Sequence, residues 1–133
     1  MIVADTNLIA YLVISGERTE LAEQVFRKDK LWAAPPLWRT ELRSVLVQHM
    51  RVNSLPLRDC LMAIDYARAA IIAEYEVSDE EVLTLATSCA CSAYDCEFIA
   101  LAQRLGVPLV TYDRRVLAEF PEIAMNAETF LAQ

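Results

Sequence analysis

The sequence predicts an α/β fold in which helices cover both faces of a parallel sheet. Short apolar runs alternate along the chain with longer segments whose apolar residues repeat at helical spacing. This alternation is typical of successive β-α units, which build parallel sheets. With 133 residues, of which 56% are hydrophobic and 23% charged, the composition is globular and the length suits one domain. We therefore expect one compact domain over residues 1–133.

The charge and cysteine content exclude several classes of function. The net charge of −7 argues against generic duplex binding, because such binding depends on Lys and Arg neutralising phosphates. The four cysteines form no C-x-x-C pair, and His49 adds no zinc-ligand spacing. No apolar stretch is long enough to span a membrane, and the chain opens without a secretory signal. We expect a soluble cytoplasmic protein with reduced cysteines packed in helices.

Two strands and three helices are expected in the first 50 residues. Residues 2–5 form an apolar run ending in an acid and predict the first strand, after which Thr6 or Asn7 can cap a helix. The apolar residues of that helix are Leu8, Ile9, Leu12 and Val13. Leu21, Ala22, Val25 and Phe26 mark a second helix. A strand over residues 31–34 then stops at Pro35-Pro36. The helical stripe that follows consists of Trp38, Leu42, Val45, Leu46 and His49.

The second half of the chain continues the alternation. Residues 57–71 predict a long amphipathic helix that leads into a strand over residues 75–77. Ser78 and Glu81 read as a capping box for a helix whose inward residues are Val82, Leu85, Ala86 and Cys89. Ser92 begins the next helix, which Gly106 closes. A strand over residues 109–112, a helix over 114–120, a strand over 123–125 and a terminal helix through Phe130 and Leu131 complete the chain.

The acidic residues are the most informative feature for function. Asp5 ends the first strand and Asp113 ends the strand over residues 109–112, while Glu41 and Asp95 lie on predicted helices. In open parallel α/β sheets, ligands bind outside the carboxyl ends of the strands. Carboxylates crowded there without a cation would repel one another, so the pattern indicates a site for a hard divalent ion such as Mg²⁺ or Mn²⁺. Thr6, Asn7 and Thr111 are placed to orient the ligands.

Each acid also has a purely structural explanation. Asp5 can cap the helix after the first strand, and Asp113 can be a turn residue. Asp95 stands three residues after Ser92 and can complete a Ser-x-x-Asp capping box. Glu41 can pair with arginines or face solvent. The joint pattern favours the metal site, because two of the acids end strands of one predicted sheet.

The chain resembles the PIN domains, and more narrowly the VapC-like ribonuclease toxins of bacterial toxin-antitoxin pairs. The resemblance spans the whole chain and rests on residues 2–7 (IVADTN), on the pair Glu41-Leu42, and on residues 92–102 (SAYDCEFIALA) and 105–113 (LGVPLVTYD). It implies a five-stranded parallel sheet, a homodimer, RNA as substrate and an antitoxin whose tail covers the active site. It further implies that Asp5, Glu41, Asp95 and Asp113 bind Mg²⁺ or Mn²⁺, assisted by Thr6 and Thr111.

Residues around these motifs suggest further contacts. Arg114 and Arg115 follow Asp113, a place where the match to the family brings no further acidic residue. The two arginines either contact RNA phosphates or form the solvated start of a helix. Tyr94 and Trp38 could stack on bases, although the spacing of Trp38 favours core packing. Cys89, Cys91 and Cys96 are expected to pack as small apolar residues, yet oxidation of Cys96 would disturb Asp95. The apolar surface of residues 57–71 and around His49 and Met50 predicts a twofold dimer contact.

These observations lead to the hypothesis of a metal-dependent endoribonuclease. Water would attack the RNA phosphodiester in line and leave a 5′-phosphate and a 3′-hydroxyl. The main alternative is a non-catalytic PIN-like module that binds RNA or protein. A phosphatase of the aspartyl-phosphate type ranks lower, because Asp5-Thr6-Asn7 lacks the second carboxylate that such enzymes require.

Overall fold

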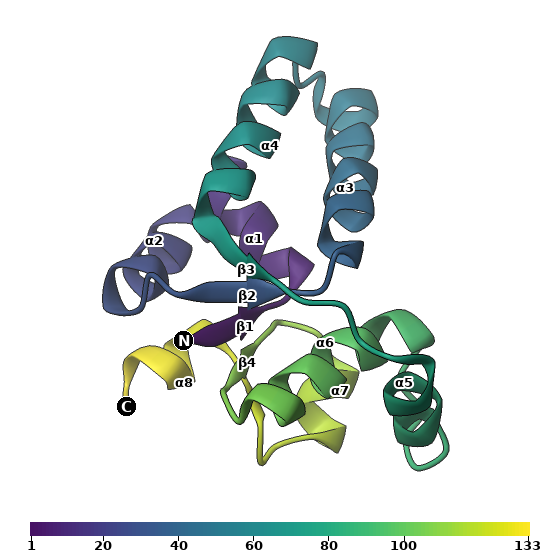
Figure 1. Ribbon diagram of the computed structural model, residues 1–133. Helices are drawn as coiled ribbons and strands as arrows, with labels where there is room; N and C mark the ends of the chain where they lie inside the picture. Colours follow the sequence, from purple (N-terminus) through teal and green to yellow (C-terminus); the bar gives the residue numbers. More distant parts are fainter.

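Five parallel strands form the centre of the computed structural model, which describes residues 1–133 (Figure 1). They are β1 (Ile2–Ala4), β2 (Trp32–Ala34), β3 (Ile71–Glu74), β4 (Leu109–Val110) and β5 (Ala124–Met125), and their order in the sheet is β3-β2-β1-β4-β5. Every neighbouring pair is parallel. The predicted five-stranded parallel sheet is therefore confirmed.

The order in which the chain adds strands to the sheet reverses at β1. From β1 the chain builds the sheet outward through β2 and β3, and it then crosses to the opposite side of β1 to add β4 and β5. In the register of the sheet, Val3 lies opposite both Ala33 and Leu109. Crevices at such a reversal are the usual ligand sites of open parallel sheets, so the residues after β1 and β4 are of most interest.

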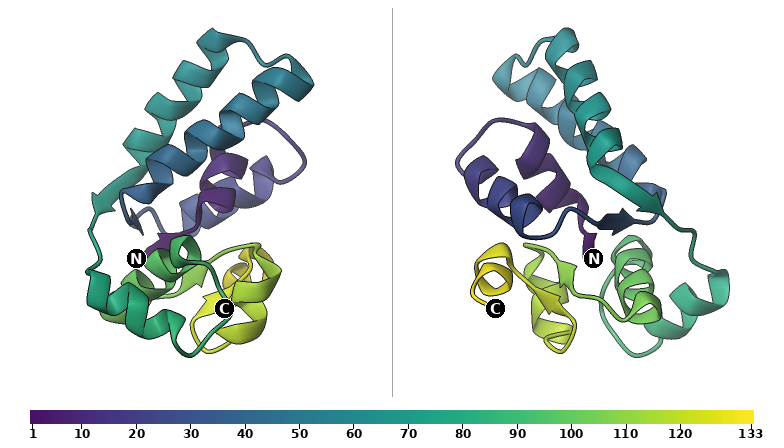
Figure 2. Two further views of the ribbon diagram at one scale, coloured as in Figure 1. Left: turned by 90° about the vertical axis from the view of Figure 1, so that its right-hand side faces the viewer. Right: turned by 60° about the vertical axis from the view of Figure 1, so that its left-hand side comes forward.

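Two groups of helices lie on opposite sides of the strands, as Figures 1 and 2 show. The first group is α1 (Thr6–Val13), α2 (Thr19–Lys28), α3 (Leu37–Asn53) and α4 (Leu57–Ala70). The second group is α5 (Asp79–Ala86), α6 (Ala93–Leu105) and α7 (Arg114–Glu119), whereas α8 (Ala127–Leu131) packs against α2, where Lys28 Nζ donates to the Phe130 carbonyl (2.7 Å). Helices α3 and α4 form a hairpin that projects away from the sheet in both figures.

The core is apolar and continuous from the sheet into both helix groups. It contains 33 buried residues, and its largest fully buried side chains include Trp32, Trp38 and Phe98. Trp38 donates a hydrogen bond through Nε1 to Glu74 Oε2 (2.9 Å), which satisfies its one polar atom. Trp38 is thus a core residue, as its spacing favoured, and it has no exposed ring for a base. None of the helices combines the length and the apolar character that crossing a bilayer requires.

The third strand begins earlier than predicted. Helix α4 ends at Ala70, and β3 starts at Ile71, not at residue 75. The prediction of Ile71 as a helical position was wrong because the pairing of Ile71 with Trp32 of β2 draws a β-branched residue into the sheet. The residues predicted as the strand, 75–77, instead form the connection to α5.

Smaller differences concern strand ends and cysteines. Leu31 and Ile123 lie just before β2 and β5, and Thr111 lies just after β4. The Thr111 N–H still donates to the Met125 carbonyl (3.0 Å), so the sheet pairing continues one residue past β4. Cys89 and Cys91 lie between α5 and α6, so the expectation that all four thiols pack in helices was wrong for these two.

Candidate active site

Asp5 is a buried acid at the carboxyl end of the central strand. Its side chain is the N-cap of α1, and Oδ1 accepts a hydrogen bond from the Thr6 N–H (2.7 Å). Oδ2 accepts a second bond from the Thr111 hydroxyl (2.6 Å). Burial raises the pKa of Asp5 to about 6, against the lowering effect of both hydrogen bonds. The capping explanation of Asp5 is therefore correct, and the same geometry holds its carboxylate rigidly at the point where the strand order reverses.

Glu41 reaches the same place from the first turns of α3. The Thr6 hydroxyl donates a hydrogen bond to Glu41 Oε1 (2.7 Å), which leaves the other carboxylate oxygen free of protein donors. Glu41 is half-buried, and burial together with the charges of Asp95 and Glu97 raises its pKa. Glu41 thus neither pairs with an arginine nor points into solvent, and Thr6 links it to the carboxylate of Asp5.

Asp95 lies in the first turn of α6, which Ser92 caps by accepting a hydrogen bond from the Asp95 N–H (3.1 Å). Burial and the charge of Asp113 raise the pKa of Asp95, while Ser92 and Arg115 lower it. The charge of Asp95 in turn contributes to the raised pKa values of Asp5 and Glu41. Asp95 therefore shares one electrostatic environment with the other three acids.

Asp113 caps α7, since Oδ1 accepts a hydrogen bond from the Val116 N–H (2.9 Å). Its own N–H donates to the Thr111 hydroxyl oxygen (3.0 Å). Thr111 is fully buried and is therefore the connecting residue of the site. It bonds to Asp5 and Asp113, and it accepts a longer bond from Asn7 Nδ2 (3.4 Å).

Hydrogen bonds join five of the predicted site residues, and Asp95 is related to them through its charge alone. The predicted set is Asp5, Thr6, Glu41, Asp95, Thr111 and Asp113. No group of three or more His, Cys, Asp or Glu side chains lies in a ready-made arrangement for a metal ion. The candidate ligands are nevertheless all carboxylates. Burial and mutual repulsion raise the pKa values of three of them, Asp5, Glu41 and Asp95. A cation among them would remove that repulsion, so the residues fit a hard divalent ion.

Glu97 is an acid near the site that the sequence did not single out. It is half-buried on α6, burial raises its pKa, and its charge raises the pKa of Glu41. It stands two residues after Asp95, a separation that points side chains to different faces of a helix, so spacing alone gave no reason to include it.

The residues predicted to contact RNA differ in exposure and in the hydrogen bonds they make. Arg115 donates through Nη1 to the Ala90 carbonyl (3.0 Å), so part of its hydrogen-bonding capacity is already used. Arg114 is exposed, and Tyr94 is 61% exposed one residue before Asp95. Arg39 pairs with Glu74 (2.9 Å).

The cysteines near Asp95 are packed together. The Cys89 and Cys96 sulfurs are 3.8 Å apart, and Cys91 donates to Glu119 Oε2 (3.2 Å). Cys91 and Cys96 are buried, which agrees with the predicted packing role. Burial raises the pKa of Cys96 to about 12, so this thiol stays protonated at neutral pH.

Comparison with known proteins agrees with this architecture. The family model for the PIN domain matches residues 2–123. Ribonuclease VapC3 of Pyrobaculum aerophilum is 25% identical over 126 residues, which cover 92% of this chain and 96% of the relative.

Solved structures with the same fold include the crystal structure of PAE2754 from Pyrobaculum aerophilum. The match has a TM-score of 0.79 at 20% sequence identity, and it covers 98% of this chain and 93% of the PAE2754 chain. A toxin-antitoxin complex from Klebsiella pneumoniae contains a chain with a TM-score of 0.67 at 20% identity, covering 96% and 98% of the two chains. Since the family model spans nearly the whole sequence, the chain belongs to the PIN-domain family.

Proposed function

We propose that this chain is a metal-dependent endoribonuclease and the toxin of a toxin-antitoxin pair. The observation that carries the proposal is the set of four acids around the end of β1, in which Thr111 and Thr6 hold Asp5 and Glu41. Membership of the PIN-domain family supports it, as does the relative named Ribonuclease VapC3. The structural neighbour from a toxin-antitoxin complex supports an antitoxin as partner. We propose the cytoplasm as its compartment, and residues 1–133 as one nuclease domain.

Mg²⁺ or Mn²⁺ is the proposed cofactor, held by Asp5, Glu41, Asp95 and Asp113. These ions prefer oxygen ligands, and the site offers only oxygen donors. When bound, such an ion neutralises charge on the phosphoryl oxygens and lowers the pKa of water. The raised pKa values of Asp5, Glu41 and Asp95 support this role, because they indicate negative charge that a cation would stabilise.

The residues of the chain have distinct tasks in this reaction. Thr6 orients Glu41 through Oε1, so Oε2 of Glu41 is free to accept a proton from the attacking water. Thr111 bonds to the Asp5 carboxylate and to the backbone N–H of Asp113. These bonds keep both carboxylates in place while charge develops on the reacting phosphate. Water attacks the phosphorus and gives a proton to Glu41, the bond from phosphorus to the 3′ oxygen breaks, and that oxygen takes a proton from solvent water. The products are a 5′-phosphate and a 3′-hydroxyl.

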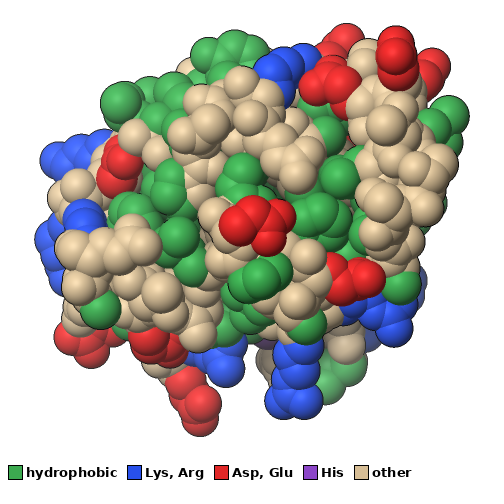
Figure 3. Space-filling view, turned by 90° about the horizontal axis from the view of Figure 1, so that it is seen from below, with side chains coloured by type: hydrophobic (Ala, Val, Ile, Leu, Met, Phe, Trp, Pro, Cys, Tyr) green, Lys and Arg blue, Asp and Glu red, His purple; other side chains and the backbone are tan.

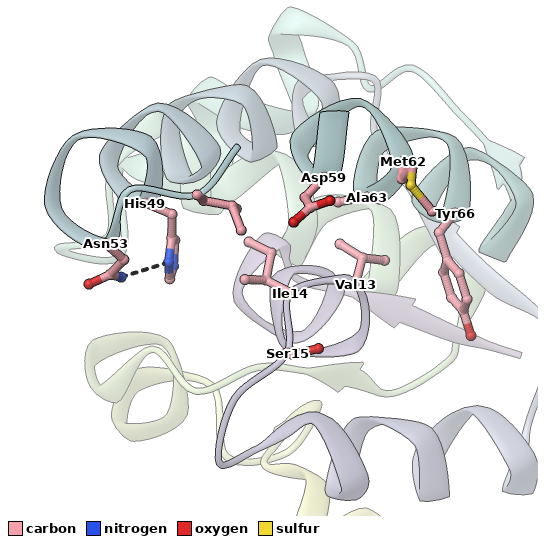
Figure 4. Close-up of a pocket in the computed structure, with 10 residues that line it drawn as sticks. Val13, Ile14, Ser15, His49, Asn53, Asp59, Met62, Ala63 and Tyr66 are labelled. Carbon is pink, nitrogen blue, oxygen red and sulfur yellow. Dashed lines mark hydrogen bonds between the residues drawn. The ribbon is translucent and has the colours of Figure 1, made fainter. Parts of the chain in front are cut away.

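We also propose that the chain acts as a homodimer through the α3–α4 hairpin. Leu57, Leu61 and Met62 of α4 are 62%, 54% and 63% exposed, so much apolar surface faces solvent there. Figure 4 shows the adjoining hollow, with a volume of about 610 Å³, between the end of α1 and the hairpin. Met62 and Tyr66 line it together with Val13 and Ile14. An isologous contact of this hairpin would cover these apolar side chains.

The decisive experiment uses the purified chain, freed of any antitoxin, with total cellular RNA. The wild type is incubated with Mn²⁺ or with chelator, the Asp95→Asn variant is incubated with Mn²⁺, and new 5′-phosphate ends are mapped. Defined ends that form only with wild type and metal support the ribonuclease. Glu122→Gln, at an exposed acid near β5, is the matched control and should cut as wild type does.

The alternative is a PIN-like module that binds RNA or protein without cleaving it. It is favoured by the lack of any ready-made group of three metal-binding side chains. A folded wild-type protein that yields no new ends with Mn²⁺, yet retains RNA or a protein partner, would favour this alternative.

A further inference from the structure

Three planar side chains pack together beside the site. The Arg18 guanidinium carbon lies 4.2 Å from the ring centroid of Tyr112 and 5.3 Å from that of Tyr11. The two rings meet edge to face, with centroids 5.4 Å apart and planes at 72°. A guanidinium over aromatic faces is attracted by their negative surface, which restricts its orientation. Arg18, in the connection between α1 and α2, is thus held in place although it is exposed.

Tyr112 connects this cluster to the acids. It lies between Thr111 and Asp113 in the chain, and its N–H donates to Asn7 Oδ1 (3.2 Å). Its hydroxyl donates to Glu128 Oε2 (2.9 Å), which fixes the far end of the ring. Arg18 therefore takes its position from a residue that is bonded at both ends and that directly precedes a proposed metal ligand.

The hydrogen-bonding capacity of Arg18 is unused. Arg39 pairs with Glu74 and Arg104 pairs with Glu81, whereas Arg18 has no such partner, a property it shares with Arg43, Arg51, Arg68 and Arg114. Arg18 makes no side-chain hydrogen bond, and none of the ion pairs of the structure includes it, although Glu17 and Glu20 are near in sequence. A stacked guanidinium with free N–H groups is prepared for an anion with paired oxygens, such as a phosphate.

The hollow beside Arg18 extends along the helices that carry the site. Its volume is about 410 Å³, and Tyr11 of α1 and Ile14, just after α1, line it together with Val45 and His49 of α3. Val45 stands one helical turn after Glu41, so this hollow begins one turn from the acids. An RNA strand leaving the acids along this hollow would pass Arg18.

The overall charge disfavours RNA binding except through local cations. The chain carries a net charge of −7, and the acids at the site add local repulsion to a polyanion. On the face shown in Figure 3, Lys and Arg side chains form separate groups with acidic and apolar residues between them, without a continuous basic surface. On that face, phosphate contacts would have to come from individual cations.

We propose that Arg18 binds a phosphate that flanks the scissile bond of the RNA, with Tyr11 and Tyr112 holding its guanidinium in position. This inference rests on the proposed ribonuclease function and adds a specific substrate contact to it. Because the phosphate stays charged throughout the reaction, Arg18 contributes to binding the ground state and the transition state alike. Its loss should therefore raise KM and leave kcat nearly unchanged.

The test uses a labelled single-stranded RNA that spans a mapped cleavage site. Binding is measured in the Asp95→Asn background, where the RNA stays intact, with and without Arg18→Gln, over a range of salt concentrations. Loss of one phosphate contact should make the slope of log K, the RNA-binding constant, against log salt concentration less negative by about 0.7. With Asp95 intact, Arg18→Gln should raise KM about tenfold, the value expected for a charged hydrogen bond, with kcat within about twofold.

Two further variants distinguish a phosphate contact from a structural role. Arg18→Lys keeps the charge but loses the planar fork, so it should restore the salt slope and only part of the affinity. Arg51→Gln removes an equally exposed arginine at the far end of α3 and should leave slope and KM unchanged. The inference would be overturned if Arg18→Gln left the salt dependence of RNA binding unchanged. It would also be overturned if Arg51→Gln changed that dependence as much as Arg18→Gln does. A wild type that cleaves no RNA would overturn the ribonuclease proposal itself, and this inference with it.

Discussion

The Thr111 hydroxyl donates a 2.6 Å hydrogen bond to Asp5 Oδ2, joining two buried side chains that are 106 positions apart in the sequence. The two residues follow neighbouring strands, β1 and β4, on either side of the point where the strand order reverses. The same Thr111 oxygen accepts the N–H of Asp113, so one hydroxyl positions two acids. Several consequences of this arrangement can be measured.

Removing the Thr111 hydroxyl should destabilise the protein. Thr111→Val keeps the shape of the side chain but leaves Asp5 Oδ2 buried without its donor. We expect a loss of about 1–3 kcal/mol in the free energy of unfolding, measured by urea titration, because an unsatisfied buried acceptor costs that much. Thr111→Ser should recover most of the loss. Thr84→Val, at an exposed threonine of α5, is the control and should change stability by less than about 0.5 kcal/mol.

The metal-free protein should lose stability as the pH rises through about 6, the raised pKa of Asp5. The folded state holds the Asp5 proton more tightly than the unfolded state, so this contribution is fully present below pH 3.8 and is lost on passing the folded pKa. Asp5→Asn removes the titration and keeps an acceptor for Thr6. In chelator, raising the pH from 4 to 7 should cost wild type up to about 3 kcal/mol more than the variant, which lacks the Thr111 bond at every pH. An equal pH dependence of Tm in both proteins would contradict this.

A divalent ion should stabilise the wild type and not its ligand variants. Binding to the folded state alone raises stability by mass action, so Mn²⁺ should raise the Tm of wild type at pH 7 by roughly 4 °C. Asp95→Asn and Glu41→Gln should respond less, because each removes a charged oxygen donor. Differential scanning fluorimetry measures the shift, and excess chelator should reverse it. Glu122→Gln, outside the site, should retain the full wild-type response.

The dimer can be tested at the exposed apolar surface of α4. Wild type should sediment as a dimer at micromolar concentrations, and Leu61→Glu should be monomeric, because a charge buried in an apolar contact is not compensated. Leu61 is 54% exposed, so the substitution should leave the monomer folded. Leu83→Glu is the matched control, since Leu83 is 63% exposed on α5, away from the hairpin. A wild type that is only monomeric would contradict the proposed dimer.

Local patterns predicted most helix starts. Ser78 and Glu81 form the capping box read from the sequence, and Ser92 caps α6 as expected. Such signals depend on side chains bonding to backbone within one turn, so a linear sequence contains them. The start of β3 was missed because Ile71 is a strand residue only through its pairing with β2, a contact distant in sequence.

The sequence by itself determined the α/β class, the acids that end or follow strands, and the residues expected to assist them, because alternation, capping and residue chemistry are local properties. The partner of each threonine hydroxyl depends instead on how distant segments pack: Thr6 bonds to Glu41, and Thr111 to Asp5. The same packing places Arg18 over Tyr112, 94 positions along the chain. These contacts depend on strand order and on burial, which raises the pKa of Asp5, and both arise only when distant segments pack together.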